Sequence, residues 1–269
     1  MQKIPFLFAC LAIMATACRK DVSSERIAQT NGTLLVKRID FTGTYSVITN
    51  YAYDNADRVV TVDVTIRGDS SGFVRILHFY THYNRNSSGK IISIESRGSY
   101  TDLGATTDTA TTEVLYYPDG KVNCMGDSSI VYYYDSLNRI ARTDFYNFIV
   151  HRPITYSTYS YDANGNIDHI NSYRLDNSGN YVFNVGYDLS YDSKLNPLFS
   201  HDDVLVPYEW YTMVSPNNIV GQITHYSWQP MLDDHNITVF QYNTAGLPVR
   251  SVFNSTGVSG PRNSLYYYQ

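Results

Sequence analysis

One short pattern recurs down this chain: tyrosine, aspartate, a polar turn, a basic residue and then apolar residues. The clearest copy is residues 131–142 (VYYYDSLNRIAR), and further copies begin at residues 51–54 (YAYD) and 159–162 (YSYD). Copies about 30 residues apart are typical of an array of supersecondary units. Aspartate or asparagine at the start of a turn accepts hydrogen bonds from backbone N–H groups two residues on. Each copy therefore predicts one β-hairpin.

The tyrosine just before each predicted turn marks the repeats. These markers are Tyr53, Tyr83, Tyr117, Tyr134, Tyr161, Tyr191, Tyr242 and Tyr268. Most turns then supply a glycine, and two supply Asp57 or Asn138, the residue types that best tolerate a left-handed backbone. A basic residue such as Arg139 often follows and can pair with the turn carboxylate, but an exposed pair contributes only about 0 to 1 kcal/mol.

Apolar residues after the turns recur at a spacing of three, as in Ile91 and Ile94 or Ile167 and Ile170. One face of a regular strand demands a spacing of two. We therefore expect β-bulges near the turns, in a sheet that curls on itself. Residues 100–113 (YTDLGATTDTATTE) interrupt the rhythm and predict a threonine-rich loop.

The composition favours strands throughout. The chain has 26 tyrosines among 269 residues and 17% charged residues, and no segment after the first seventeen shows helical periodicity. The predicted fold is all-β: an antiparallel meander of repeated β-hairpins that forms a curled sheet, an open barrel or a short solenoid. A net charge of -5 provides no basic surface for phosphate backbones, so we expect no nucleic-acid partner.

The N-terminus predicts export and lipidation. Lys3 precedes an apolar run over residues 4–17 that is too short to span a bilayer, as in a secretion signal. Residues 15–18 (ATAC) resemble a lipobox, in which Cys18 receives lipid and becomes the mature N-terminus. Lipoboxes prefer leucine where this chain has Ala15, so a plain secretory signal cut near Ala17 is the alternative. Together with Cys18, residues 19–21 (RKD) resemble the Cys-x-Lys-Asp sequence at the mature N-terminus of some Gram-negative lipoproteins, which marks export to the outer surface.

The remaining cysteine has no intrachain partner. Cys10 leaves with the signal and Cys18 carries lipid, so we expect no disulfide and a small buried strand residue at Cys124. We predict a signal peptide at residues 1–17, a lipidated N-terminus and flexible tether at 18–33, and a β domain at 34–269. The expected location is the outer membrane, at the cell surface of a Gram-negative bacterium.

The tyrosine-aspartate pattern resembles the YD repeat of Rhs proteins and teneurins. The match covers most of residues 45–269, with strong copies at 51–54, 132–135, 159–162 and 190–192. The chain is also similar to short YD-repeat-like lipoproteins of uncharacterised function on Gram-negative surfaces, in which a Tyr-Asp segment leads into Asn-Pro, as in residues 191–197. The resemblance implies a β-meander or solenoid. It does not imply the closed toxin shell of long Rhs chains, because this chain has too few units.

Two aromatic pairs are the candidate binding residues. Tyr208 with Trp210, and Tyr226 with Trp228, are two residues apart, so each pair shares one face if its segment is a strand. Aromatic platforms bind sugars and peptides, although such pairs also serve as core or cross-strand packing. We expect a binding or scaffolding role without catalysis, with a polysaccharide or an envelope protein as partner.

Two other function classes stay open. A glycan-processing enzyme would draw carboxylates from residues 199–236, where 201–203 (HDD) and 233–235 (DDH) lie, and needs two carboxyl groups about 5 to 10 Å apart. A structural or assembly partner of another envelope protein would need an open sheet edge. No spacing matches a ligand motif, so we predict no metal and no cofactor. Residues 108–110 (DTA) resemble a bacterial O-glycosylation sequon, and an exposed loop without sugar is the alternative.

Overall fold

The computed structural model describes residues 33–43, 45–70, 73–100, 105–126, 129–147, 152–199, 214–228, 233–256 and 260–269. The signal peptide, Cys18, Tyr208, Trp210 and residues 201–203 lie outside the described residues. Within the described part, no helix is both long and apolar enough to cross a membrane.

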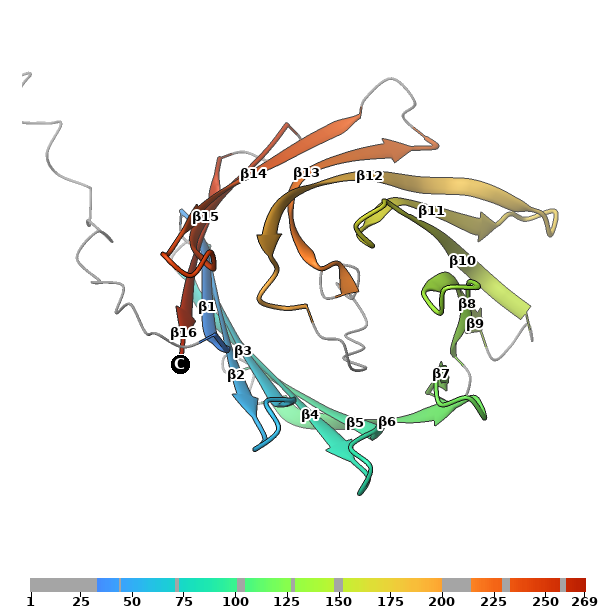
Figure 1. Cartoon of the computed structure of the whole chain (residues 1–269), viewed down its shortest axis with the longest axis horizontal. Coiled ribbons are helices and arrows are strands. Elements are labelled where there is room, and N and C mark those ends of the chain that lie inside the picture. Colours follow the sequence, from blue (N-terminus) through green and yellow to red (C-terminus); the bar gives the residue numbers. More distant parts are fainter. Residues whose placement is uncertain are drawn as a thin grey trace, which may run out of the picture.

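Sixteen antiparallel strands follow one another in chain order, and β1 pairs with β16 to close the sheet into a barrel (Figure 1). The strands are β1 (Leu35–Thr42), β2 (Tyr45–Tyr53), β3 (Val59–Ser70), β4 (Phe73–Arg85), β5 (Ile91–Tyr100), β6 (Ala105–Tyr116), β7 (Val122–Met125), β8 (Ile130–Tyr134), β9 (Ile140–Asn147), β10 (Arg152–Tyr161), β11 (Ile167–Leu175), β12 (Tyr181–Leu195), β13 (Asn217–Tyr226), β14 (Asp234–Tyr242), β15 (Pro248–Ser255) and β16 (Arg262–Tyr268). The all-β meander is confirmed, and a closed barrel replaces the open forms that the sequence left available.

Closure has a direct consequence for one of the function classes. Each described strand pairs on both sides, from the β1–β2 pair round to the β15–β16 pair. Strand addition requires an unpaired edge. The described strands therefore offer no free edge to which an assembly partner could add a strand.

The bulges predicted from the apolar spacing are present. Arg85 pairs with Ile91, but its neighbour Asn84 pairs with Ser93, so the register shifts by one residue next to the turn. The same shift occurs beside five other turns, at Ala52/Tyr53, Leu115/Tyr116, Tyr133/Tyr134, Ser160/Tyr161 and Gln241/Tyr242. The extra residue turns Ile91 and Ile94 to the same face, which explains their spacing of three.

Six turns at one end of the barrel share one geometry: residues 54–58, 86–90, 117–121, 135–139, 162–166 and 243–247. We call this end the Tyr-Asp end. In the turn at Asp135, the N–H of Asp135 donates to the carbonyl of Arg139, and the N–H of Asn138 donates to the carbonyl of Asp135. The fourth residue has a positive φ in each, 65° at Asn138 and 86° at Gly165. This is a type I turn followed by a left-handed residue.

Tyrosine hydroxyls link successive hairpins at this end. Tyr161 Oη donates to the carbonyl of Ile140 at 2.8 Å, and Ile140 is the first strand residue after the preceding turn. Equivalent bonds join Tyr53 to Leu35, Tyr116 to Ile91, Tyr134 to Val122, Tyr191 to Ile167 and Tyr268 to Pro248. Together they form a ladder of hydroxyl-to-carbonyl bonds along the Tyr-Asp end.

Two of the eight markers were misplaced. Before the turn at 86–90, the position equivalent to Tyr53 is held by Arg85, not Tyr83, and its Nη2 donates to the carbonyl of Val59 at 3.4 Å. Before the turn at 117–121, Tyr116 holds the ladder position while Tyr117 replaces the usual aspartate. Tyr83 lies two residues before the ladder position and Tyr117 one residue after it, because Arg85 and Tyr116 fill these positions and the sequence alone does not fix where each turn begins.

The inner face of the barrel holds the core. Three clusters of buried apolar side chains form this core, and the first includes Tyr83, Ile94 and Val114. Cys124 is 4% exposed on β7, as predicted for a small buried strand residue. The prediction of a loop over residues 100–113 was wrong, because β6 begins at Ala105 and pairs with β5. Threonine suits an exposed strand as well as a loop.

Candidate functional site

A hollow of about 400 Å³ lies on the outer face of β3, β4 and β5. Its residues are brought together by the sheet register: Asp63 pairs with Tyr80, Tyr80 with Arg97, and His82 with Glu95. Paired residues point to the same face of a sheet. These residues alternate along the strands with inward residues such as Val62 and Tyr83, so they point outward.

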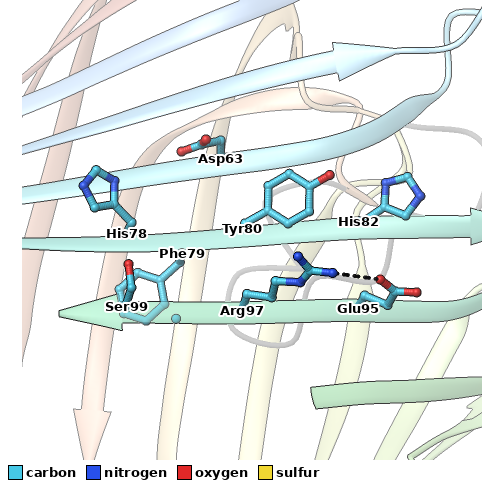
Figure 2. A pocket seen from close by; sticks show the side chains of 9 residues that line it. Asp63, His78, Phe79, Tyr80, His82, Glu95, Arg97 and Ser99 are labelled. Carbon is cyan, nitrogen blue, oxygen red and sulfur yellow. Dashed lines mark ion pairs between the residues drawn. The ribbon is translucent and has the colours of Figure 1, made fainter. Parts of the chain in front are cut away.

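Figure 2 shows a flat ring surface beside charged groups. The rings of Tyr80 and His82 are parallel within 3°, with centroids 6.4 Å apart. Arg97 Nη2 lies 4.0 Å from Glu95 Oε2, and Glu95 Oε1 accepts a hydrogen bond from Asn84 Nδ2 at 2.9 Å. The hollow thus combines an aromatic platform with a hydrogen-bonded carboxylate and a guanidinium beside it.

One polar atom at this hollow lacks a partner. His82 Nδ1 is buried and has no hydrogen-bond partner among the described residues. A buried polar atom normally has a partner, because leaving it unpaired costs about 1–3 kcal/mol. Tyr80, by contrast, is 36% exposed and offers an open ring face. A ligand with an apolar face can pack on this ring, whereas His82 Nδ1 itself is closed to solvent.

The structure brings together one of the two predicted aromatic pairs. The rings of Tyr226 and Trp228 lie 4.8 Å apart between centroids, at 43°. Tyr226 Oη donates to Asp234 Oδ2 at 2.9 Å, and this bond raises the pKa of Tyr226. Trp228 follows the end of β13 and is 58% exposed. The other pair, Tyr208 and Trp210, lies outside the described residues, and the binding role of all four stays a prediction.

The acidic stretch 233–235 does not converge on one point. Asp233 Oδ1 lies 3.1 Å from His225 Nδ1, Asp234 accepts from Tyr226, and the N–H of His235 donates to Thr256 Oγ1. In the described part of the chain, no three His, Cys, Asp or Glu side chains are grouped to hold a metal ion. The carboxylates of residues 201–203 lie outside the described residues, so the catalytic alternative stays a prediction.

A histidine-aspartate network on the outer face escaped sequence reasoning. Asp188 Oδ1 lies 2.7 Å from His169 Nδ1, and its Oδ2 lies 2.9 Å from His225 Nε2. Burial raises the pKa of Asp188, but the bonds to both histidines outweigh it and lower that pKa. The bond to Asp188 raises the pKa of His225, with burial opposing and Asp233 adding to the rise. These residues come from β11, β12 and β13, so only the strand register could have revealed the network.

Another group of outward aromatic residues is satisfied by its own contacts. Tyr156 stacks on Tyr173 with centroids 4.7 Å apart, and Tyr181 meets Tyr156 edge-on at 5.0 Å. Arg142 lies 4.0 Å from the Tyr156 ring centre and pairs with Asp144, which is 3% exposed. This arrangement is cross-strand packing, and it provides control positions for the hollow.

Comparisons with known proteins give fold likeness alone. No family model matches the chain, and no curated protein matches it. A porin-like protein from Bacteroides vulgatus aligns with a TM-score of 0.47 and 12% identity over 88% of this chain and 98% of that chain. A porin-like protein from Bacteroides uniformis aligns with a TM-score of 0.47 and 9% identity over 87% of this chain and 98% of that chain. The TcdB2-TccC3-TEV structure aligns with a TM-score of 0.33 and 11% identity over 79% of this chain and 13% of that chain. At these TM-scores, the likenesses carry no argument about what this chain does.

Proposed function

We propose that this protein is an outer-membrane lipoprotein that binds a neutral glycan in the hollow on β3–β5 and does not catalyse a reaction. The observation that carries the proposal is the flat Tyr80–His82 surface set among Asp63, Glu95 and Arg97. Aromatic faces pack against the C–H face of a sugar ring, while carboxylate and guanidinium groups hydrogen-bond its hydroxyls.

The charge of the hollow favours a neutral ligand. Two carboxylates, Asp63 and Glu95, face one guanidinium, Arg97, so there is no excess of positive charge to select an acidic sugar. His82 adds a donor or acceptor according to its tautomer. A run of hydroxyl groups satisfies such a mixture of donors and acceptors.

The proposed anchor is the lipid on Cys18, with residues 18–33 as the tether. Its support is the signal-like N-terminus together with the outer face of the barrel. Charged side chains point outward on β3–β5 and on β11–β13, and such side chains favour contact with water. The proposal therefore places the barrel beside the membrane at the cell surface.

Calorimetric titration tests the proposal. The chain from residue 19 onward, which contains the whole closed barrel, is titrated with neutral and acidic polysaccharides and cell-wall fragments. We expect saturable binding of a neutral polysaccharide, at least tenfold weaker in Tyr80→Ala, because stacking contributes about 1–3 kcal/mol per aromatic contact. Trp228→Ala tests the Tyr226–Trp228 surface in the same assay.

The matched control is Tyr181→Ala. Tyr181 is 37% exposed, against 36% for Tyr80, and it also lies on the outer face but away from the hollow. Binding that survives Tyr80→Ala unchanged, or no binding across the panel, would refute the proposed site.

A further inference from the structure

A second cavity, of about 600 Å³, lies inside the barrel. Its walls come from β1, β2, β13–β16 and residues 196–198, and none of its described lining residues also lines the hollow on β3–β5. Val47, Phe240 and Phe253 line it with apolar and aromatic surface. Cavities of this size and mixed lining are typical of sites for small organic molecules.

Most of the charge inside this cavity is neutralised. Arg38 Nε donates to Asp40 Oδ2 at 2.8 Å, and Ser264 Oγ donates to Asp40 Oδ1 at 2.5 Å. Asp40 thus has a partner on each oxygen, and its charge is balanced by Arg38. This pair leaves no net charge to attract or repel a ligand.

Arg262 is different, because no ion pair with a carboxylate is found for it among the described residues. Its guanidinium lies 5.5 Å from the ring centre of Phe253 and is exposed. Arg262 begins β16, at the end of the barrel opposite the Tyr-Asp end, where Thr42 and Tyr45 also line the cavity. The cavity therefore has a cation at its mouth and, within its mixed lining, an apolar surface at Val47, Phe240 and Phe253.

We propose that the barrel interior binds an amphipathic carboxylate, with its apolar body along Val47, Phe240 and Phe253 and its carboxylate on the Arg262 guanidinium. A planar guanidinium binds a carboxylate through two parallel N–H···O bonds. The apolar body gains free energy by leaving water. This ligand is distinct from the glycan of the outer hollow and binds at a separate place.

Fluorescence of cis-parinaric acid, with its methyl ester as the uncharged probe, tests the proposal on the chain from residue 19 onward. We expect a saturable rise in fluorescence with the acid. Arg262→Gln should weaken binding of the acid at least tenfold and leave binding of the ester unchanged. The control is Arg250→Gln on β15, since Arg250 is adjacent to the inward Ser251 and points outward, where its Nη2 bonds Asn263 Oδ1.

A second variant locates the probe inside the barrel. Thr238→Phe puts a ring into the cavity and should weaken acid and ester alike, with near-ultraviolet circular dichroism confirming the fold. Tyr80→Ala should change neither, so this site and the glycan site can fail separately. Absence of saturable fluorescence, an acid affinity that Arg262→Gln leaves intact, or indifference to Thr238→Phe would overturn the proposal.

Discussion

The two ends of the barrel are built differently. The Tyr-Asp end repeats one turn, one bulge and one tyrosine bond from hairpin to hairpin. At the opposite end, one connection among the described residues uses the same turn, residues 176–180, but Leu175 replaces the tyrosine and Asn180 replaces the basic residue. The same backbone turn therefore occurs with and without its side-chain supports.

The contacts that stabilise the fold are repeated at the Tyr-Asp end and, among the described residues, are not repeated at the opposite end. At the Tyr-Asp end, Lys90, Lys121 and Arg139 lie over the rings of Tyr116, Tyr134 and Tyr161 of the next hairpin. These three turns are thus tied to the next hairpin through a ring, a hydroxyl and a cation. The opposite end carries the cavity mouth at Arg262 and the exposed Trp228, features without a repeated counterpart. We infer that the repeats stabilise the barrel and leave the other end open to ligands.

The largest expected effect comes from removing a ladder tyrosine. Tyr161→Ala loses the bond to the Ile140 carbonyl and the ring beneath Arg139, and should lower the free energy of unfolding by about 3 kcal/mol. Leu175→Ala, the equivalent change at the opposite end, should cost about 1 kcal/mol because it removes packing alone. Urea unfolding measures both. Equal losses of unfolding free energy in the two variants would contradict the special role given to the ladder tyrosine.

The turn carboxylates should show a smaller contrast. Asp135 Oδ1 accepts from the N–H groups of Leu137 and Arg139, and its Oδ2 pairs with the Arg139 guanidinium. Asp176 accepts the two equivalent N–H bonds, from Ser178 and Asn180, and no ion pair with a cation is found for it among the described residues. We expect Asp135→Ala to lower the free energy of unfolding by about 2 kcal/mol and Asp176→Ala by about 1 kcal/mol, as measured by urea unfolding. A larger loss at Asp176 would contradict the role given to the cation.

The two ends should also respond oppositely to pH. Hydrogen bonds from Arg58 lower the pKa of Asp54 from 3.8 to about 2, so this stabilisation is present above the unfolded pKa and is lost as pH falls toward 2. The pKa of His225 is raised above 6.5, so its contribution is present below that value and is lost as pH rises through the folded pKa. Asp54→Asn should reduce the acid loss, and His225→Asn the alkaline loss, in unfolding followed against pH. An unchanged pH profile in either variant would refute the assignment for that residue.

The smallest effects should come from the left-handed turn residues. Gly165 has a φ of 86° and no atom near the position of an added Cβ, so Gly165→Ala isolates backbone strain and should cost about 1 kcal/mol. Asn138 has a φ of 65°, and Asn138→Gly should stabilise the chain by about 0.5 kcal/mol. Thermal unfolding detects both. Stabilisation by Gly165→Ala would contradict the turn assignment.

The sequence predicted the features that neighbouring residues determine, namely the hairpin turns and the bulges beside them. Turn composition located the hairpins, and the spacing of Ile91 and Ile94 correctly indicated bulges. Closure depends on β1 meeting β16, a pairing between chain ends that no local pattern encodes. The hollow was missed for the same reason: Tyr80 and His82 are visible as neighbours, but Asp63 and Glu95 join them only through register. The chain's tryptophans drew attention instead, because aromatic pairs are conspicuous in sequence.

Hydrogen–deuterium exchange tests the central claim most directly. The chain from residue 19 onward is compared with and without the polysaccharide that binds most tightly in the calorimetric panel. The account predicts added protection in Phe73–Arg85 and Ile91–Tyr100, with none in Ile130–Tyr134 or Ile167–Leu175. Protection confined to the turns of the Tyr-Asp end, or a bound polysaccharide that leaves β4 and β5 unprotected, would contradict it.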